Sequence, residues 1–156
     1  MSYSKFLKDL NNGLYYETEL IKHIPHIKYT QSQGIFKEYD LKIYHQSKRY
    51  NTYEVKSDKQ INIYGNICIE YNCRNKPSGI SISTARYWAI FEPKDTLYTL
   101  YIIPSKIIKK YIENKKYHRD CKGGDDHASK LYLFKKELFK DYIVYSNIYN
   151  NEYNNK

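Results

Sequence analysis

The stretch that decides the fold reads Asn51-Thr52-Tyr53-Glu54-Val55-Lys56-Ser57-Asp58. Its composition and alternation predict a β-strand, and side chains at positions i and i+2 of a strand point to the same face. Glu54 and Lys56 therefore present a carboxylate and an ammonium side by side. Tyr53 and Val55 point the other way, into a core.

A second carboxylate, that of Asp40, lies in the preceding strand-like run, residues 35–44. The short connection 45–48 folds the two runs back antiparallel, so that Asp40 and Glu54 become neighbours across the pair. Two carboxylates ~4 Å apart repel by roughly 4 kcal/mol at an effective dielectric constant near 20. The pair needs a proton, a cationic partner or a divalent metal, and hard oxygen ligands suit Mg²⁺ or Mn²⁺. A solvated hairpin with an ordinary Glu54–Lys56 ion pair is the alternative.

Further blocks follow this hairpin along the chain, in the order Gly65-Asn66-Ile67-Cys68-Ile69-Glu70-Tyr71, Lys76-Pro77-Ser78-Gly79-Ile80, Thr84-Ala85-Arg86-Tyr87-Trp88 and Gly123-Gly124-Asp125. Together with Asp40 and Glu54-Val55-Lys56, the series resembles the PD-(D/E)XK nuclease superfamily, in a phage- and virus-type branch. The resemblance covers roughly residues 13–138, and it departs from the family pattern because no proline precedes Asp40. It implies an α/β fold with a restriction-endonuclease-like core, in which an antiparallel meander belongs to a mixed β-sheet flanked by helices.

The same resemblance implies a metal-dependent nuclease that hydrolyses phosphodiester bonds, with a DNA endonuclease as the expected form. Asp40, Glu54 and Lys56 would be the catalytic residues. Mg²⁺ or Mn²⁺ would be held by Glu17, Asp40, Glu54 and the main-chain carbonyl of Val55. Lys56 would position or activate the attacking water and stabilise the transition state.

Glu17 also stands out in the pattern of the first helix, which is predicted over residues 4–24. Apolar positions at steps of three and four form an inward stripe with one gap, which Glu17 fills: Leu7, Leu10, Leu14, Ile21 and Ile24. A carboxylate on a buried stripe is costly without a partner, and the resemblance puts a glutamate of the first helix in the metal site. Two alternatives remain: Glu17 ends the apolar face, or Gly13 breaks the helix in two.

Two further carboxylates are candidates for the surroundings of the site. Asp58 shares the strand parity of Lys56, so it would orient Lys56 or a bound water; the alternative is a strand-end aspartate in a turn. Residues 66–71 predict a third strand. If this strand pairs with the second, Glu70 approaches the site as a metal or water ligand; otherwise Glu70 is a partner for Arg74.

Residues 74–83 form a basic, turn-rich segment. Backbone amides and small hydroxyls bind phosphate oxygens without reading sequence, so this segment predicts nucleic-acid contacts. The residues concerned are Arg74, Lys76, Ser78, Gly79 and Thr84. An ordinary loop with a helix cap at Ser81 or Ser83 is the alternative.

The remaining pattern predicts strands over residues 87–91, 97–103 and 131–134, a helix from 104 to about 114, and a polar loop over 117–129. Residues 135–142 predict a closing helical turn or a continuation of the last strand. A single nuclease-like domain is expected over residues 1–146, followed by a polar C-terminal tail, residues 147–156.

The composition of the chain indicates which classes of binding partner to expect. The 156 residues include 26 Lys and Arg against 17 Asp and Glu, a net charge of +9 that favours a polyanion, with DNA as the expected nucleic acid. No apolar run approaches the ~20 residues that span a bilayer, and the N-terminus lacks the pattern of a signal peptide. We therefore expect a soluble intracellular protein of the cytoplasm or nucleus, without a membrane partner. The abundance of Tyr, Lys, Asn and Ile indicates an AT-rich genome, of which a virus is one source.

Several alternatives stay open at this point. A non-catalytic nucleic-acid-binding module on the same fold is the rival function, although such a module has no need of two adjacent carboxylates that repel phosphate. The sequence does not decide between DNA and RNA, the structure of the substrate, sequence specificity, one metal or two, and a monomer or a homodimer.

Overall fold

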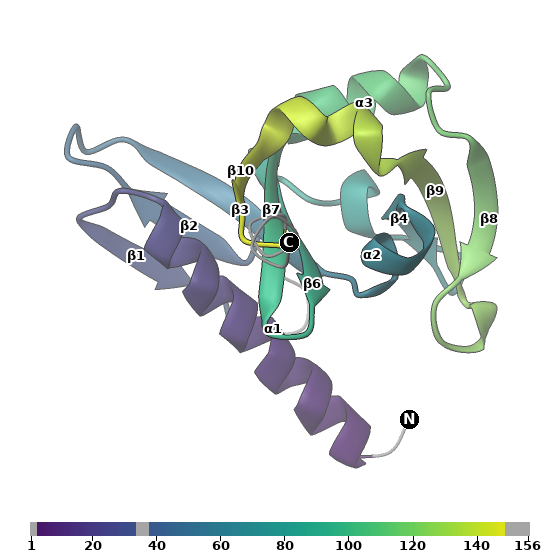
Figure 1. Cartoon of the computed structure of the whole chain (residues 1–156), viewed down its shortest axis with the longest axis horizontal. Helices are drawn as coiled ribbons and strands as arrows, with labels where there is room; N and C mark the ends of the chain where they lie inside the picture. The colour runs from purple at the N-terminus through teal and green to yellow at the C-terminus, as the bar shows by residue number, and fades with distance from the viewer. Residues whose placement is uncertain (1–2, 34–37, 149–156) are drawn as a thin grey trace, which may run out of the picture.

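A long N-terminal helix and two β-sheets make up this α/β fold (Figure 1). The structure is a computed structural model that describes residues 3–33 and 38–148. Helix α1 spans Tyr3–His23. The larger sheet has the strand order β1-β2-β3-β6-β7-β10, with bounds Lys28–Gln31, Leu41–Tyr44, Tyr50–Ser57, Tyr87–Lys94, Leu97–Pro104 and Ile143–Ser146. This sheet is mixed: β3 and β6 pair in parallel, and the other adjacent strands of the sheet pair antiparallel.

The smaller sheet is antiparallel and has the order β5-β4-β9-β8, with bounds Lys76–Pro77, Asn66–Cys73, Ser129–Lys135 and Arg119–Gly123. Two short α-helices complete the fold, α2 over Gln60–Tyr64 and α3 over Ser105–Glu113. Three 3-10 segments lie between strands: η1 over Gly79–Ser81, η2 over Asp125–His127 and η3 over Lys136–Tyr142.

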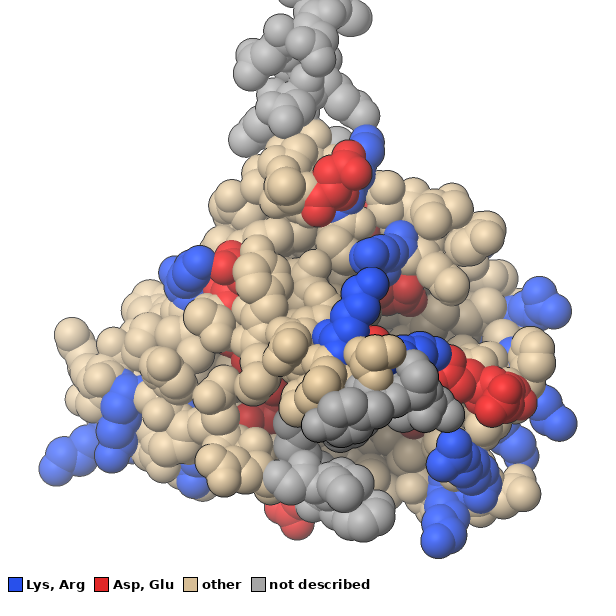
Figure 2. All heavy atoms as spheres, turned by 90° about the horizontal axis from the view of Figure 1, so that it is seen from below, with Lys and Arg blue, Asp and Glu red and all other residues tan. Residues whose placement is uncertain are grey.

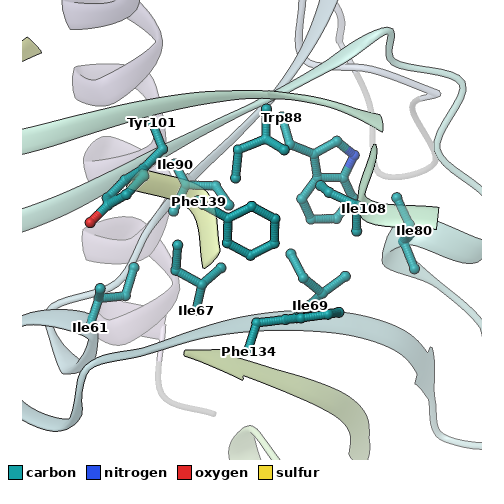
Figure 3. Packing of buried hydrophobic residues seen from close by; sticks show 11 residues of the cluster. Ile61, Ile67, Ile69, Ile80, Trp88, Ile90, Tyr101, Ile108, Phe134 and Phe139 are labelled. Carbon is teal, nitrogen blue, oxygen red and sulfur yellow. The ribbon is translucent and has the colours of Figure 1, made fainter. Parts of the chain in front are cut away.

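The two faces of the larger sheet are covered by different layers. The C-terminal half of α1 packs on one face through Tyr16 and Leu20, with Ile24 just after the helix, against buried residues of β2, β3, β6 and β7. The smaller sheet, α2, α3 and η3 cover β6 and β7 on the other face. Figure 3 shows this second core, in which Phe139 lies among side chains from both sheets.

The predicted first helix is confirmed, but part of its predicted inward stripe is wrong. Leu7, Leu10 and Leu14 are exposed by 38%, 49% and 45%. The reason is length: α1 is longer than the sheet it covers, and its N-terminal half extends past the strands (Figure 1). These leucines therefore lie outside the core that Leu20 and Ile24 join.

The predicted antiparallel meander exists but is built from other strands than expected. It consists of β1, β2 and β3, and β1 was not predicted. In the predicted first strand, only Leu41–Tyr44 is a strand, while residues 34–37 lie outside the described part of the chain. The predicted third strand exists as β4, but it pairs with β9 and β5 and not with β3. After β3 the chain turns into α2, which leaves the position beside β3 to β6.

Three further strands were also missed, of which β5 lies in the predicted turn-rich segment 74–83. β8 occupies part of the predicted loop 117–129, and β10 follows η3. Both are edge strands with mostly polar or exposed side chains, which leave no apolar alternation to detect. The predicted strands over 87–91, 97–103 and 131–134 and the helix from 104 are confirmed as β6, β7, β9 and α3.

The last described residues of the chain are attached to the larger sheet. Asn147, expected in the tail, exchanges hydrogen bonds with the main chain of Tyr98, and Ile148 is buried; the remaining tail lies outside the described residues. Within residues 3–33 and 38–148, no helix is both long enough and apolar enough to cross a membrane.

Candidate active site

A cleft of about 440 Å³ opens between the N-terminal half of α1 and the strands that it overhangs. Four residues predicted to form the site line it together: Glu17, Asp40, Val55 and Lys56. The other residues that line the cleft are Asp9, Leu10, Gly13, Leu14, Ser32 and Gln33. Segments separated by up to 47 positions thus meet around one hollow.

Asp40 is fixed to β3 on both sides of Glu54. Its main-chain N–H donates to the carbonyl oxygen of Tyr53 over 2.9 Å, and its Oδ2 accepts a hydrogen bond of 2.7 Å from the N–H of Val55. Because β2 begins one residue later, at Leu41, the Asp40 side chain reaches the main chain of β3 in place of a further strand residue. The predicted proximity of Asp40 and Glu54 follows from this attachment.

Glu54 and Lys56 form the ion pair that their spacing predicts, with 2.8 Å between Lys56 Nζ and Glu54 Oε1. The Glu54 side chain is 12% exposed and that of Lys56 is 51% exposed. Crowding by protein atoms lowers the pKa of Lys56, but attraction by Glu54 and, further off, by Asp40 and Glu70 outweighs it, so the pKa lies above its usual value. Lys56 is therefore cationic at neutral pH.

Glu17 is buried at the cleft wall, 6% exposed, and its Oε2 accepts a hydrogen bond of 3.0 Å from Gln31 Nε2. The carboxylates of Asp9, Glu17 and Asp40 and the ammonium of Lys56 all line the same hollow. Acidic groups thus outnumber basic ones among its described lining residues. A cation in this hollow would be attracted by these carboxylates.

The donor chemistry of this cleft fits a small, hard cation. Mg²⁺ is commonly bound through one or two carboxylates while it keeps several of its waters, and Asp40 and Glu17 are buried carboxylates that face a space large enough for water. Within the described residues, no group of three or more His, Cys, Asp and Glu side chains is gathered closely enough to hold a metal by itself. A cation there would rely on two carboxylates, main-chain oxygen and water.

Asp58 lies at a turn. Its Oδ1 accepts a hydrogen bond of 2.8 Å from the N–H of Gln60 at the start of α2. Its charge also adds to burial in raising the pKa of the Cys68 thiol to about 11. These contacts favour the strand-end alternative over a role in orienting Lys56.

Glu70 comes near Lys56 by another route than the predicted one. β4 does not pair with β3, yet the charge of Glu70 contributes to the raised pKa of Lys56. The Glu70 carboxylate accepts a hydrogen bond of 2.5 Å from Ser129 Oγ. Glu70 therefore acts on the site from the facing sheet.

The predicted nucleic-acid contacts lie beside the site rather than in it. None of the five residues Arg74, Lys76, Ser78, Gly79 and Thr84 is among the described residues that line the cleft. Thr84 is held by Glu38, whose carbonyl oxygen accepts from the Thr84 N–H over 3.0 Å. Gly79 adopts a φ of +51° against the main chain of Glu70, so this segment is tied to the sheet that faces Lys56.

The helical stripe predicted Leu10 and Leu14 as core residues and not as the wall of a cleft, and no role was predicted for the amide side chains near it. Leu10, Gly13 and Leu14 lie one and two turns before Glu17, so the helical period that singles out Glu17 also places them on its face. Gln31 and Gln33 gave no signal, because isolated amides in a short connection follow no periodic pattern.

The chain matches no protein-family model, no curated protein and no solved structure.

Proposed function

We propose that this protein is a metal-dependent nuclease that hydrolyses phosphodiester bonds, acting as a DNA endonuclease. The observation that carries the proposal is the attachment of Asp40 to β3 around Glu54, next to Lys56, in a cleft that Glu17 also lines. Two buried carboxylates at one hollow, those of Asp40 and Glu17, with the ammonium of Lys56 held by Glu54, are groups that metal-assisted phosphodiester hydrolysis uses.

The fold supports this assignment. Helix α1 precedes an antiparallel meander, and the last strand of the meander joins a mixed sheet through its parallel partner β6. A helix followed by such a meander is what a restriction-endonuclease-like core requires. The candidate residues lie on the helix and on the two adjacent strands that this core would use.

The carboxylates of Asp40 and Glu17, the main-chain carbonyl of Val55 and water would hold Mg²⁺ or Mn²⁺, while Glu54 would hold Lys56 in place. When bound, the metal would polarise the scissile phosphate and make a water acidic enough to attack it at neutral pH. The chain's own contribution is to hold the donors: the Val55 N–H fixes the Asp40 carboxylate, and Gln31 fixes Glu17.

Lys56 would contribute positive charge at the transition state. Its half-exposed ammonium lines the cleft, and the ion pair with Glu54 keeps it protonated and holds it in place. A fixed cation aimed at developing negative charge stabilises that charge without reorganisation during the reaction.

The rival function is a nucleic-acid-binding module without turnover. One observation favours it: Glu54 and Lys56 already neutralise each other. The net charge of +9 serves both functions, since phosphate neutralisation gives salt-dependent affinity with or without cleavage. Figure 2 shows one face on which Lys and Arg lie at the margins and near the centre, with Asp and Glu among them.

A nuclease panel decides between the two functions. Plasmid, linear duplex, single strand, four-way junction and RNA are each incubated with Mg²⁺, Mn²⁺ or EDTA. The nuclease predicts metal-dependent cutting that is lost in Lys56→Ala and kept in Lys140→Ala, a matched change of an exposed lysine on η3. Salt-sensitive binding without cutting of any substrate would support the binding module instead.

A further inference from the structure

The β2–β3 hairpin carries two tyrosine rings and two ammonium groups on one face. Tyr44 and Tyr50 are cross-strand partners with ring centroids 5.7 Å apart. Lys42 Nζ lies 3.9 Å from the centroid of the Tyr50 ring, and Lys28 Nζ lies 4.6 Å from that of Tyr44. We call these four residues the tyrosine–lysine platform.

This platform lies on the face of the sheet to which Glu54 and Lys56 point, opposite the face that α1 covers. Leu41 and Ile43 are fully buried on the side of α1, so the alternating residues Lys42 and Tyr44 point to the opposite side. In β3, Tyr50 has the parity of Glu54. The two residues are four positions apart, which is about 13 Å along a strand.

The platform lies where the smaller sheet does not cover the larger one. Residues of that sheet pack on Trp88 and Ile90, further along the same side, whereas Tyr50 is 51% exposed. Figure 1 shows β1, β2 and β3 extending away from β8 and β9. The Tyr50 ring is thus exposed on this face, and Tyr44 beside it is half-buried.

The local charge is one-sided. Residues 25–33 and 41–53 contain no Asp or Glu, yet they include Lys28, Lys42, Lys48 and Arg49. An anionic ligand with flat, apolar faces complements such a surface. A single nucleic-acid strand has both properties, because its phosphates pair with lysines while its unstacked bases lie on aromatic rings.

We propose that the tyrosine–lysine platform binds single-stranded DNA on the sheet face that carries Glu54 and Lys56, with bases on Tyr44 and Tyr50 and phosphates on Lys28 and Lys42. The choice of DNA rests on the proposed function. The choice of a single strand rests on the rings, since the base faces in a duplex are already stacked on one another and closed to tyrosine. The nuclease would then act at a junction, flap or gap where unpaired bases reach the hairpin.

The test measures binding without cleavage. A fluorescein-labelled 12-nucleotide single strand and the duplex of the same length are titrated with the full chain in EDTA, and anisotropy gives Kd. Tyr50→Ala is expected to weaken single-strand binding about 5- to 100-fold, the range for one lost base stack. Tyr50→Phe keeps the ring and should keep the affinity.

Two further variants sharpen the result. Tyr64→Ala removes a tyrosine that is 67% exposed but lies on α2, and it should bind as the wild type does. Lys42→Met should weaken binding and flatten the plot of log K against log salt by about 0.7, the value for one phosphate contact to a single strand. This second variant decides the matter if circular dichroism shows that Tyr50→Ala does not fold.

The proposal is overturned if the wild type fails to bind the single strand, if Tyr50→Ala and Tyr64→Ala behave alike, or if Tyr50→Ala weakens the duplex as much as the single strand. Equal competition by polyglutamate would also overturn it, because the surface would then select charge alone. Since EDTA prevents metal-dependent cutting, these outcomes are independent of the nuclease panel, and either proposal can fail while the other stands.

Discussion

The Oδ2 atom of Asp40 accepts a hydrogen bond of 2.7 Å from the main-chain N–H of Val55, the residue between Glu54 and Lys56. This bond joins the end of one strand to the middle of the next. It fixes the carboxylate that faces the cleft at the point where the ion pair of Glu54 and Lys56 is displayed. A substitution that removes the charge of Asp40 but keeps this hydrogen bond therefore tests the electrostatic role of Asp40 alone.

Asp40→Asn makes that change. The amide oxygen can still accept from Val55, so the fold should be kept, but the negative charge that would hold a metal is lost. We expect Mn²⁺ affinity, measured by calorimetry, to fall at least about 10-fold, since even residues that only support a metal ligand contribute that much, and cutting to be lost. Asp95→Asn is the control, because Asp95 is exposed at a turn with a φ of +56° that asparagine tolerates. Unchanged Mn²⁺ binding in Asp40→Asn would remove Asp40 from the metal site.

Glu54→Gln tests the ion pair. Attraction by Glu54 is the largest effect that raises the pKa of Lys56, and crowding by protein atoms opposes it. Without the Glu54 charge, less attraction offsets the lowering of the pKa by the surrounding protein atoms. The pKa of Lys56 should therefore fall. An NMR titration of the lysine side chains checks the direction, with Glu113→Gln on the exposed end of α3 as control. An unchanged or higher pKa of Lys56 in Glu54→Gln would contradict the assignment.

Much of the site could be predicted from sequence because it depends on short periods. The i, i+2 spacing puts Glu54 and Lys56 on one face wherever the strand lies in the fold, and the helical stripe singles out Glu17 in the same way. The hairpin needs only a short connection to bring Asp40 back to β3. Each of these statements is local, and local geometry is set by the backbone.

The pairing of distant strands could not be predicted in the same way. β4 has the alternation of a strand, but no local pattern says that its partner is β9, some 60 residues later, rather than β3. The turn at Asp58 into α2 makes the difference, and its only signal is one aspartate before a five-residue helix. Leu10 and Leu14 were placed on the correct face, yet periodicity cannot tell a core from the wall of a cleft.

The glycines at positions 79 and 13 predict opposite effects of the same substitution. At Gly79 a Cβ atom would lie 2.1 Å from the carbonyl oxygen of Glu70, and φ is +51°, so Gly79→Ala should destabilise the fold by about 2–4 kcal/mol. At Gly13 in α1 a Cβ meets nothing within 4 Å, so Gly13→Ala should stabilise the fold by about 0.5–1 kcal/mol. Urea unfolding measures both. Equal free energies of unfolding for the two variants would contradict the backbone conformation at Gly79.

A buried acidic group away from the site predicts a second effect on stability. Glu92 is 2% exposed; its Oε1 accepts from Lys136 Nζ over 2.7 Å and its Oε2 from the Tyr101 hydroxyl over 2.9 Å. Lys136→Ala leaves a buried carboxylate without the ammonium that neutralises it, which should cost about 3 kcal/mol in the free energy of unfolding. Lys135→Ala changes the exposed neighbour and should cost less than about 0.5 kcal/mol. A loss below 1 kcal/mol in Lys136→Ala would mean that water replaces the ammonium.

The contact between α1 and β7 predicts how stability depends on pH. His23 Nε2 lies 2.7 Å from the Tyr98 hydroxyl, which donates to Glu19 Oε2 over 3.0 Å. Burial lowers the pKa of His23; the Glu19 charge opposes this and the Lys22 charge adds to it, and the pKa stays below the usual 6.5. Between the two pKa values the unfolded chain binds a proton that the folded chain does not bind, so folding becomes less favourable as pH falls.

Urea unfolding at pH 7.5, 6.5 and 5.5 should therefore give a free energy of unfolding that becomes smaller as the pH is lowered in the wild type. His23→Gln should flatten this dependence, because the variant has no group at position 23 that takes up a proton. His127→Gln, at an exposed site in η2, should keep the wild-type slope. A slope that is the same in all three proteins would show that the protonation of His23 is not linked to folding.

A separate loss of stability is expected below about pH 4.5. Hydrogen bonding to Lys22 lowers the pKa of Glu19, and protonation of Glu19 removes that stabilisation.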